Sequence, residues 1–98
     1  MPDPSPQWQL FGFEYHVDVW IEVEKPDQDC INEVMAWVIS RMDDPYQGVQ
    51  REPGFDNLWF GRIPRTVREG TTVAGSYFIV ESERVVRCNS VATLSMPA

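Results

Sequence analysis

Residues 13–24 read Phe-Glu-Tyr-His-Val-Asp-Val-Trp-Ile-Glu-Val-Glu, and the pattern of this stretch decides which fold we expect. Every second residue from Phe13 to Val23 is apolar, and acids, His16 and Trp20 fill the alternate positions. Because side chains alternate between the two faces of a strand, this pattern predicts a long, half-buried β-strand. The odd-numbered side chains would face the core, and His16 and Trp20 would face outward.

The next segment, residues 31–42, changes to a helical period. Its apolar residues recur at spacings of three and four, and they are Ile31, Val34, Met35, Val38 and Met42. This spacing is typical of an amphipathic helix. Asp27 or Asp29 is placed to cap the first turn, and Pro45 should end the helix by about Asp43.

Residues 43–56 contain two prolines and two glycines and show no clear period. A connection of this length is at the top of the usual range and is often functional or locally ordered. Two interpretations stay open. The segment is either a structural crossover held by Tyr46, Val49 and Phe55, or a binding loop.

Three extended segments complete the chain at residues 57–63, 71–80 and 84–94, and we expect them to form antiparallel strands. Two-residue turns between them would pair Phe60 with Ile79, Gly61 with Phe78, Tyr77 with Cys88, Val80 with Val85 and Glu81 with Arg84. Pro64 interrupts the first hairpin, so a bulge or slip there would change part of this register.

These elements predict an α+β fold in the order β-α-β-β-β, with one helix packed on one face of a four-stranded, mainly antiparallel sheet. Residues 1–9 are expected to form a flexible Pro-rich tail, and residues 10–96 a single α+β domain. In the predicted register the helix-covered face carries Leu58, Phe60, Tyr77, Ile79, Val86, Cys88, Ala92 and Leu94. The open face carries His16, Trp20, Trp59, Phe78, Val80, Val85, Arg87 and Asn89, a mixture typical of interaction surfaces.

The net charge of -7 is unevenly distributed along the chain. Residues 1–40 hold eight acids and only Lys25, whereas residues 41–98 hold seven acids and seven arginines. The acidic balance disfavours RNA as a partner, because phosphate neutralisation needs a basic footprint. No apolar run is long enough to span a membrane, and the first residues lack the features of a secretory signal, so we expect a cytoplasmic protein.

Few residues are suited to catalysis or metal binding. Cys30 and Cys88 form no Cys-x-x-Cys motif and are expected to be reduced, buried thiols. His16 is the sole histidine; it lies between Glu14 and Asp18, and we expect it to be solvated. No cofactor or metal motif is present, so the sequence predicts neither, and it favours a binding function over an enzymatic one.

The arginines are the strongest candidates for partner contacts. Arg62, Arg65 and Arg68 recur at every third position, and Arg84 and Arg87 lie on the last strand. Guanidinium groups bind anionic groups and stack on aromatic rings, which makes Trp20, Trp59 and Phe78 further candidates. A structural interpretation competes, in which Arg84 pairs with Glu81 and Arg87 balances nearby acids.

A helix, a loop opening with Asp44-Pro45 and three strands follow one another in the second half of the chain. The strands read Leu58-Trp59-Phe60-Gly61-Arg62, Tyr77-Phe78-Ile79-Val80 and Arg84-Val85-Val86-Arg87. Over residues 34–92 this order resembles the RelE/ParE superfamily of bacterial toxin components. The resemblance implies an α+β fold with an antiparallel sheet, a cognate antitoxin, and either ribosome-dependent mRNA cleavage or gyrase inhibition.

Only Arg62, Arg84 and Arg87 match positions that the resemblance marks as contact residues. The chain closes with Ser90-Val-Ala-Thr-Leu-Ser-Met-Pro-Ala98, which lacks the C-terminal Arg, Tyr or His residues of RNA-cleaving members. We therefore expect a RelE/ParE-like protein of the toxin–antitoxin type that acts by macromolecular contact without nuclease activity. The alternative is a small acidic protein-binding or inhibitor module, with its open sheet face as a homodimer seam.

Overall fold

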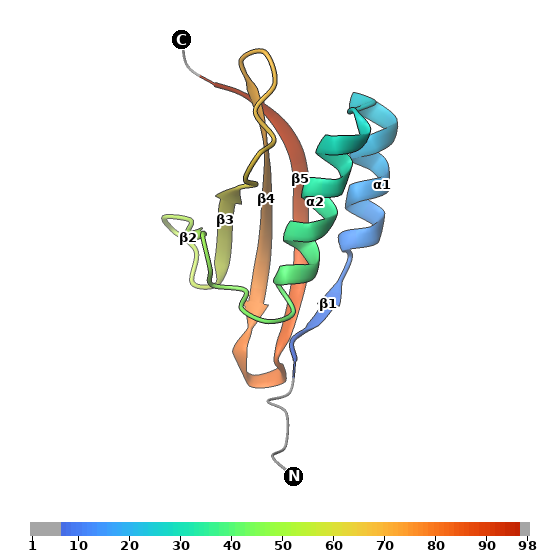
Figure 1. Ribbon diagram of the computed structural model, residues 1–98. Coiled ribbons are helices and arrows are strands. Elements are labelled where there is room, and N and C mark those ends of the chain that lie inside the picture. Colours follow the sequence, from blue (N-terminus) through green and yellow to red (C-terminus); the bar gives the residue numbers. More distant parts are fainter. Residues whose placement is uncertain (1–6, 97–98) are drawn as a thin grey trace.

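The computed structural model describes residues 7–96 of the chain. These residues form two α-helices, five strands and one short 3-10 helix (Figure 1). In chain order they are β1 (Gln9–Phe11), α1 (Phe13–Glu24), α2 (Gln28–Ser40), β2 (Gln50–Arg51), β3 (Leu58–Arg62), β4 (Thr71–Val80), η1 (Glu81–Glu83) and β5 (Val85–Ser95).

The strands form one mixed sheet in the order β1-β5-β4-β3-β2. β1 runs parallel to β5, and the other neighbours are antiparallel. The helices run in opposite directions beside each other and cover one face of the sheet (Figure 1). The α+β prediction is confirmed, and the expected four strands and one helix are corrected to five strands and two helices.

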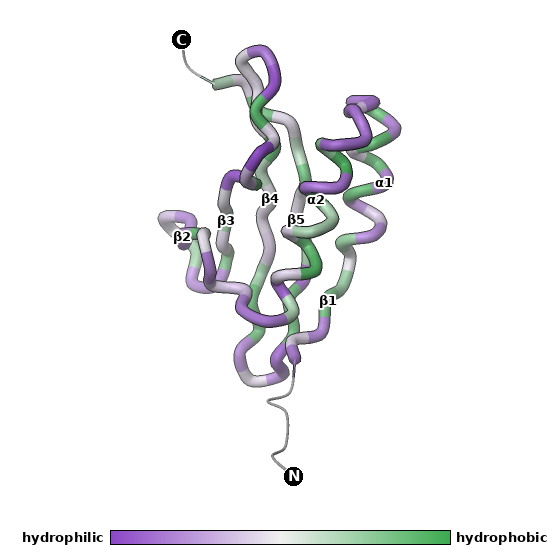
Figure 2. Tube along the Cα trace, in the orientation of Figure 1, coloured by the Kyte–Doolittle hydropathy of each residue, from purple (hydrophilic) through white to green (hydrophobic). Residues whose placement is uncertain are grey.

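The strand predicted at residues 13–24 is wrong, because this stretch forms helix α1. Phe13, Val17 and Trp20 follow a helical spacing and are buried, whereas Tyr15 and Val23 are 68% and 69% exposed. The apolar residues of this stretch fit both the alternation of a strand and the spacing of an amphipathic helix. Burial of one helical face against the core favours the helix. Both helices carry hydrophobic and hydrophilic residues along their length (Figure 2).

β1 is the short strand through which the N-terminal part of the chain joins the sheet. It pairs with β5 over only three residues, Gln9 to Phe11. Gly12 then turns the chain into α1 with φ 81°, a backbone conformation that favours glycine. The chain therefore leaves the sheet edge before residues 13–24 begin.

The amphipathic helix predicted around residues 31–42 is confirmed as α2. The side chain of Asp27 caps it by accepting a hydrogen bond from the Cys30 N–H at 2.8 Å. The helix ends at Ser40, and Arg41 occupies the C-cap position.

The three predicted C-terminal strands are confirmed as β3, β4 and β5, and so is most of the β4–β5 register. Tyr77 pairs with Cys88 and Val80 with Val85, as expected. The β3–β4 register is wrong, since Phe60 pairs with Ser76 and Gly61 with Gly75. The two-residue turn at Glu69-Gly70 is present, since Arg68 and Thr71 pair across it. The slip expected near Pro64 lies between this turn and β3, and it shifts β3 along β4.

Helix α2 packs on the sheet through Trp37. A Cβ atom at Gly75 would lie 2.5 Å from Cη2 of the Trp37 ring, so the absence of a side chain there makes room for the indole. The same ring packs against Tyr77, with ring centroids 5.7 Å apart. Glycine at position 75 therefore brings α2 close to the centre of the sheet.

The crossover 43–56 is held by two of the three side chains expected to hold it. Tyr46 makes edge contacts with Trp8 and Trp59, and Val49 packs against the core. Phe55 remains 51% exposed. Tyr46 and Val49 therefore support the structural interpretation of this segment. The expectation that Phe55 also holds the segment is wrong.

The predicted tail, residues 1–9, falls partly outside the described residues, which begin at Gln7. Trp8 is buried, and its backbone N–H donates to the Met42 carbonyl at 3.0 Å. Gln9 begins β1. The boundaries of the tail and of the 10–96 domain stay predictions.

Candidate functional site on the outer sheet face

The two faces of the sheet differ in how much of them the helices cover. On β4 the odd-numbered residues Val73, Tyr77 and Ile79 are buried against the helices, and the even-numbered residues from Ala74 to Val80 are half-buried. Because side chains alternate along a strand, the even-numbered residues lie on the face away from the helices. We call this the outer face.

The strand register identifies the outer-face residues on β3 and β5. Residues paired across antiparallel strands share a face, so Leu58 and Arg87 flank Phe78, and Phe60 and Ser90 flank Ser76. In the next row Arg62 and Ala92 flank Ala74, and at the edge Phe11 pairs with Arg87. The resulting surface combines aromatic rings, small residues and two arginines.

Polar contacts hold the middle of the outer face. The Ser76 and Ser90 hydroxyls lie 2.7 Å apart, and Asn89 Nδ2 donates to Ser76 Oγ at 3.0 Å. A register shift between Ser76 and Tyr77 lies at the same place. At the edge, the Arg87 guanidinium stacks 5.2 Å from the centre of the Phe11 ring.

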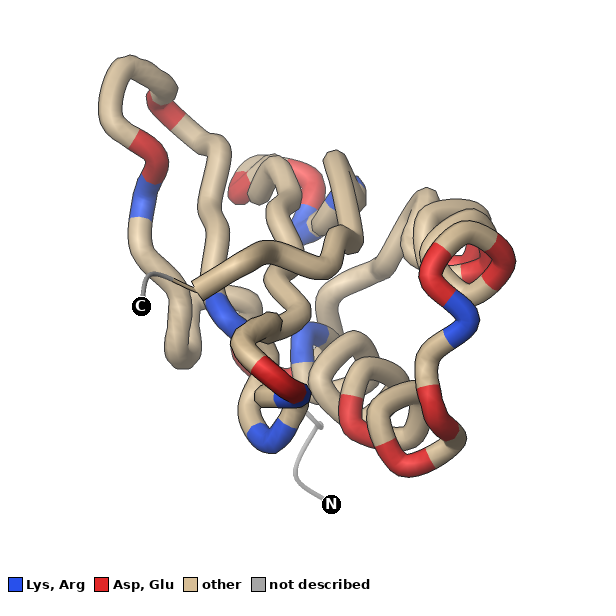
Figure 3. Tube along the Cα trace, turned by 90° about the horizontal axis from the view of Figure 1, so that it is seen from above, with Lys and Arg blue, Asp and Glu red and all other residues tan. Residues whose placement is uncertain are grey.

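The outer face and the helix layer have opposite charge. Residues 13–40 contain seven acids and Lys25, and Figure 3 shows the acids along both helices. The paired outer-face positions of β1, β3, β4 and β5 contain Arg62 and Arg87 and no acid. A protein with a net charge of -7 thus carries one locally cationic surface.

Three of the eight predicted contact residues lie on the outer face: Arg62, Arg87 and Phe78. The prediction that Trp59 and Trp20 share this face is wrong. Trp59 pairs with Tyr77 on the covered face, because the β3 register is shifted. Trp20 is 2% exposed, and its Nε1–H donates to Thr93 Oγ1 at 2.9 Å, because residues 13–24 are helical.

Other residues predicted to lie on one face or the other also change places. His16 and the acids at positions 14 to 24 lie on α1, in the layer opposite the outer face. Leu58 and Phe60 were predicted on the covered face and lie on the outer face, because the shifted β3 register pairs them with Phe78 and Ser76. Ala92 and Leu94 also join the outer face, because they pair with Ala74 and Thr72 after the register shift.

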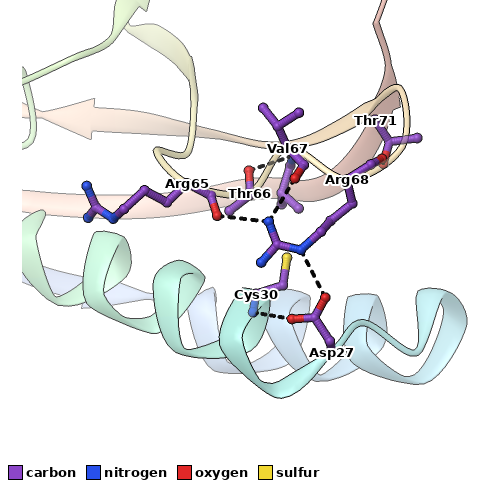
Figure 4. Close-up of polar contacts among 8 residues, drawn as sticks. Asp27, Cys30, Arg65, Thr66, Val67, Arg68 and Thr71 are labelled. Atoms are coloured by element: carbon purple, nitrogen blue, oxygen red, sulfur yellow. Dashed lines mark hydrogen bonds and ion pairs between the residues drawn. The ribbon is translucent and has the colours of Figure 1, made fainter.

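Arg65 and Arg68 connect residues 63–70 to the first half of α2 and its N-cap through ion pairs. Arg65 Nε contacts Glu33 at 2.8 Å, and Arg68 Nε contacts Asp27 at 3.0 Å. Arg68 also donates to the Arg65 and Val67 carbonyls (Figure 4). The Arg68 guanidinium lowers the pKa of the Asp27 carboxyl, chiefly through their hydrogen bond.

Arg84 lies at the β4–β5 turn. Its guanidinium lies 4.6 Å from the centre of the Trp8 ring, and its backbone N–H donates to the Glu81 carbonyl at 3.2 Å. The expected strand pair between Arg84 and Glu81 is replaced by η1, and the Glu81 carboxylate accepts a hydrogen bond from the Tyr46 hydroxyl.

Sequence reasoning missed Arg41, which is 3% exposed. Its guanidinium donates to the Trp37 and Gln47 carbonyls at 3.2 and 2.7 Å and to Tyr77 Oη at 3.0 Å. It also lies over the Trp37 ring, 4.8 Å from the centroid. Arg41 thereby joins α2, the crossover and β4, and its position four residues after Trp37 on the covered stripe was the available signal.

The cysteines and the buried tyrosine are poorly suited to proton transfer. Both thiols are free, and burial raises the pKa of Cys30 and that of Cys88, the latter to about 12. Burial also raises the pKa of Tyr77, which points into the core. Residues 7–96 contain no cluster of three or more His, Cys, Asp or Glu side chains suited to a metal ion. None of the helices described is long and apolar enough to cross a bilayer.

No family model matches the sequence, and no curated protein matches it either. Two solved structures match the fold. The isolated E. coli RelE toxin is 13% identical, with a TM-score of 0.63 over 93% of this chain and 86% of RelE. A free E. coli RelE toxin with two arginine-to-alanine substitutions is 12% identical, with a TM-score of 0.60 over 88% of this chain and 82% of RelE. The chain therefore has a RelE-like fold.

Proposed function

We propose that this RelE-like chain is the toxin-type component of a toxin–antitoxin pair and acts by macromolecular contact through its outer face. The observation that carries the proposal is the sign of the charge on that face. Arg62 and Arg87 flank Phe60 and Phe78 with no acid at the paired positions, in a chain whose net charge is -7. Arginine and aromatic side chains are the types that most often dominate binding energy.

An acidic protein segment fits this surface better than a second copy of the chain does. A symmetric dimer through the outer face would bring the same patch of both copies together and place arginines near arginines. Like charges at an interface oppose association. RNA fits less well, because the rest of the chain is acidic and would repel phosphates.

The residues of the outer face support contact rather than RNA cleavage. General acid–base catalysis needs a group that titrates near the working pH and reaches the reacting proton. Among the described residues, the paired outer-face positions of β1, β3, β4 and β5 contain no His, Cys, Asp or Glu, and arginine does not lose its proton in proteins. His16 lies on α1, in the other layer.

Growth of a bacterial host that expresses the chain tests this function. We expect wild-type protein to arrest growth and the Arg62→Ala, Arg87→Ala double variant to lose the arrest. An Arg51→Ala, Arg65→Ala variant is the matched control, because both residues are exposed and neither lies on the outer face. It removes the same charge and should still arrest growth.

Unaffected growth with folded wild-type protein would contradict the toxin-type function. A concentration-dependent dimer that the Arg62→Ala, Arg87→Ala variant strengthens would instead support the homodimeric binding module. The homodimeric module is the second candidate function, because Leu58, Phe60 and Phe78 give the outer face an apolar centre. The solution mass of both proteins distinguishes the two functions.

A further inference from the structure

A second surface lies between the helices, on the helix side of the sheet, and it reaches the outer face at Phe11, which lines both surfaces. A groove of about 590 Å³ opens where α1, α2 and β1 meet. Its floor is apolar and is formed by Leu10, Phe13, Val17 and Val38. Met35 on α2 also lines the groove and is 41% exposed, so a flexible apolar side chain is available to a ligand.

The groove has an acidic rim. Glu14 and Asp18 line it from α1, are exposed and lie one helical turn apart. No Lys or Arg lines the groove, but the Arg87 guanidinium stacks on the ring of Phe11, one of the lining residues. Within residues 7–96 the ion pairs formed by helix acids involve Asp27 and Glu33, so Glu14 and Asp18 have no cationic partner there.

We infer that this groove binds an amphipathic segment of a partner protein that carries Lys or Arg beside its apolar face. The apolar side chains would enter the groove between Val17 and Met35, and the cations would lie opposite Glu14 and Asp18. Helical segments commonly bind grooves between helices in this way. The required charge is opposite to the charge that suits the outer face, so the two surfaces select different partner chemistry.

A second copy of this chain is a poor occupant of the groove. Its helices are acidic and would repel the rim, and its outer face is a sheet surface that cannot insert between two helices. A basic segment from another protein satisfies both the shape and the charge. The inference does not rest on the outer face or on toxin activity.

The test uses two synthetic amphipathic peptides of about 16 residues, long enough to form a helix on a surface. Both have a leucine face, and the polar face is lysine in one and glutamate in the other. Binding to the full chain is followed by backbone amide NMR shifts at about 0.15 M salt, which screens distant charges. We expect the lysine peptide to bind, with shifts at residues 10–18 and 35–38, and the glutamate peptide not to bind.

Matched variants distinguish the contribution of the rim acids from non-specific attraction between the acidic helices and the lysine peptide. Glu14→Gln with Asp18→Asn should weaken the lysine peptide by about threefold or more, in line with exposed charge pairs. Glu22→Gln with Glu24→Gln removes the same charge from α1 outside the groove and should change affinity by less than about twofold. Met35→Gln should weaken binding through loss of an apolar contact in the groove, and Ile39→Gln, at an exposed α2 position outside the groove, should not.

Several results would overturn the inference. They are no binding of the lysine peptide, shifts confined to other residues, or equal weakening by the control pair on α1. The outcome is separate from the growth experiment, because the groove variants leave Arg62 and Arg87 in place.

Discussion

The inner and outer faces of β4 are built from alternate residues of the same strand, and they have different roles. Tyr77 is fully buried and contacts Phe13, Trp37 and Arg41. Phe78, the next residue, is half-buried on the face that no helix covers. Substitutions on the inner face should therefore lower stability, whereas substitutions on the outer face should weaken binding.

The largest expected effect separates these two neighbours. Tyr77→Ala should lower the free energy of unfolding by about 3–5 kcal/mol, as for other fully buried aromatics. Phe78→Ala should lower it by about 1 kcal/mol, since its ring is only partly removed from water. Urea unfolding of both variants measures the difference, and equal losses would contradict the assignment of the faces.

A smaller loss is expected where α2 approaches the sheet. Gly75→Ala places a methyl group against the Trp37 ring, which must move, and should lower the free energy of unfolding by about 1–3 kcal/mol. Ala74→Val adds bulk on the outer face and should cost less than Gly75→Ala. An unchanged stability of the Gly75→Ala protein would show that Trp37 does not pack on β4 as described.

The pair between Asp27 and Arg68 should make stability depend on pH. The pKa of Asp27 is lowered in the folded protein from 3.8, so its stabilising contribution is present above that value and is lost as the pH falls through the folded pKa. Asp27→Asn keeps a capping oxygen and removes the charge, so it should flatten this part of the pH profile. Urea unfolding between about pH 6 and pH 2 measures it, and parallel profiles for both proteins would count against the pair.

The smallest effect is expected for an exposed pair on the same connection. Arg65→Ala breaks the contact with Glu33, and because Arg65 is 72% exposed the loss should be about 0.5 kcal/mol or less. Chemical unfolding with Glu33→Gln as the partner control measures it. A loss as large as that of Gly75→Ala would mean that Arg65 has a structural role that its exposure does not suggest.

The sequence was informative where pattern and packing agree and misleading where two patterns overlap. The helical spacing at α2 and the extended segments of β3, β4 and β5 were predictable because each fits a single period. Residues 13–24 fit two periods, and burial of Phe13, Val17 and Trp20 decides between them. Local sequence contains no information on which edge of the sheet β1 occupies.

The candidate site was predictable in part for a related reason. Arg62, Arg87 and Phe78 could be named from the sequence, because their type is typical of contact surfaces. Which of these residues share a face depends on the β3–β4 register, and the slip near Pro64 changes that register. The same slip explains the corrected positions of Trp59 and Phe60. Arg41 was missed because its charge is typical of an exposed residue, although its spacing of four residues from Trp37 indicates the covered stripe.

The most direct test of the central claim is the growth of cells that express Phe78→Ala, measured together with the free energy of unfolding of the purified protein. The outer-face account predicts that growth arrest is lost while the protein remains folded and close to wild-type stability. Full arrest by a folded Phe78→Ala protein would contradict it.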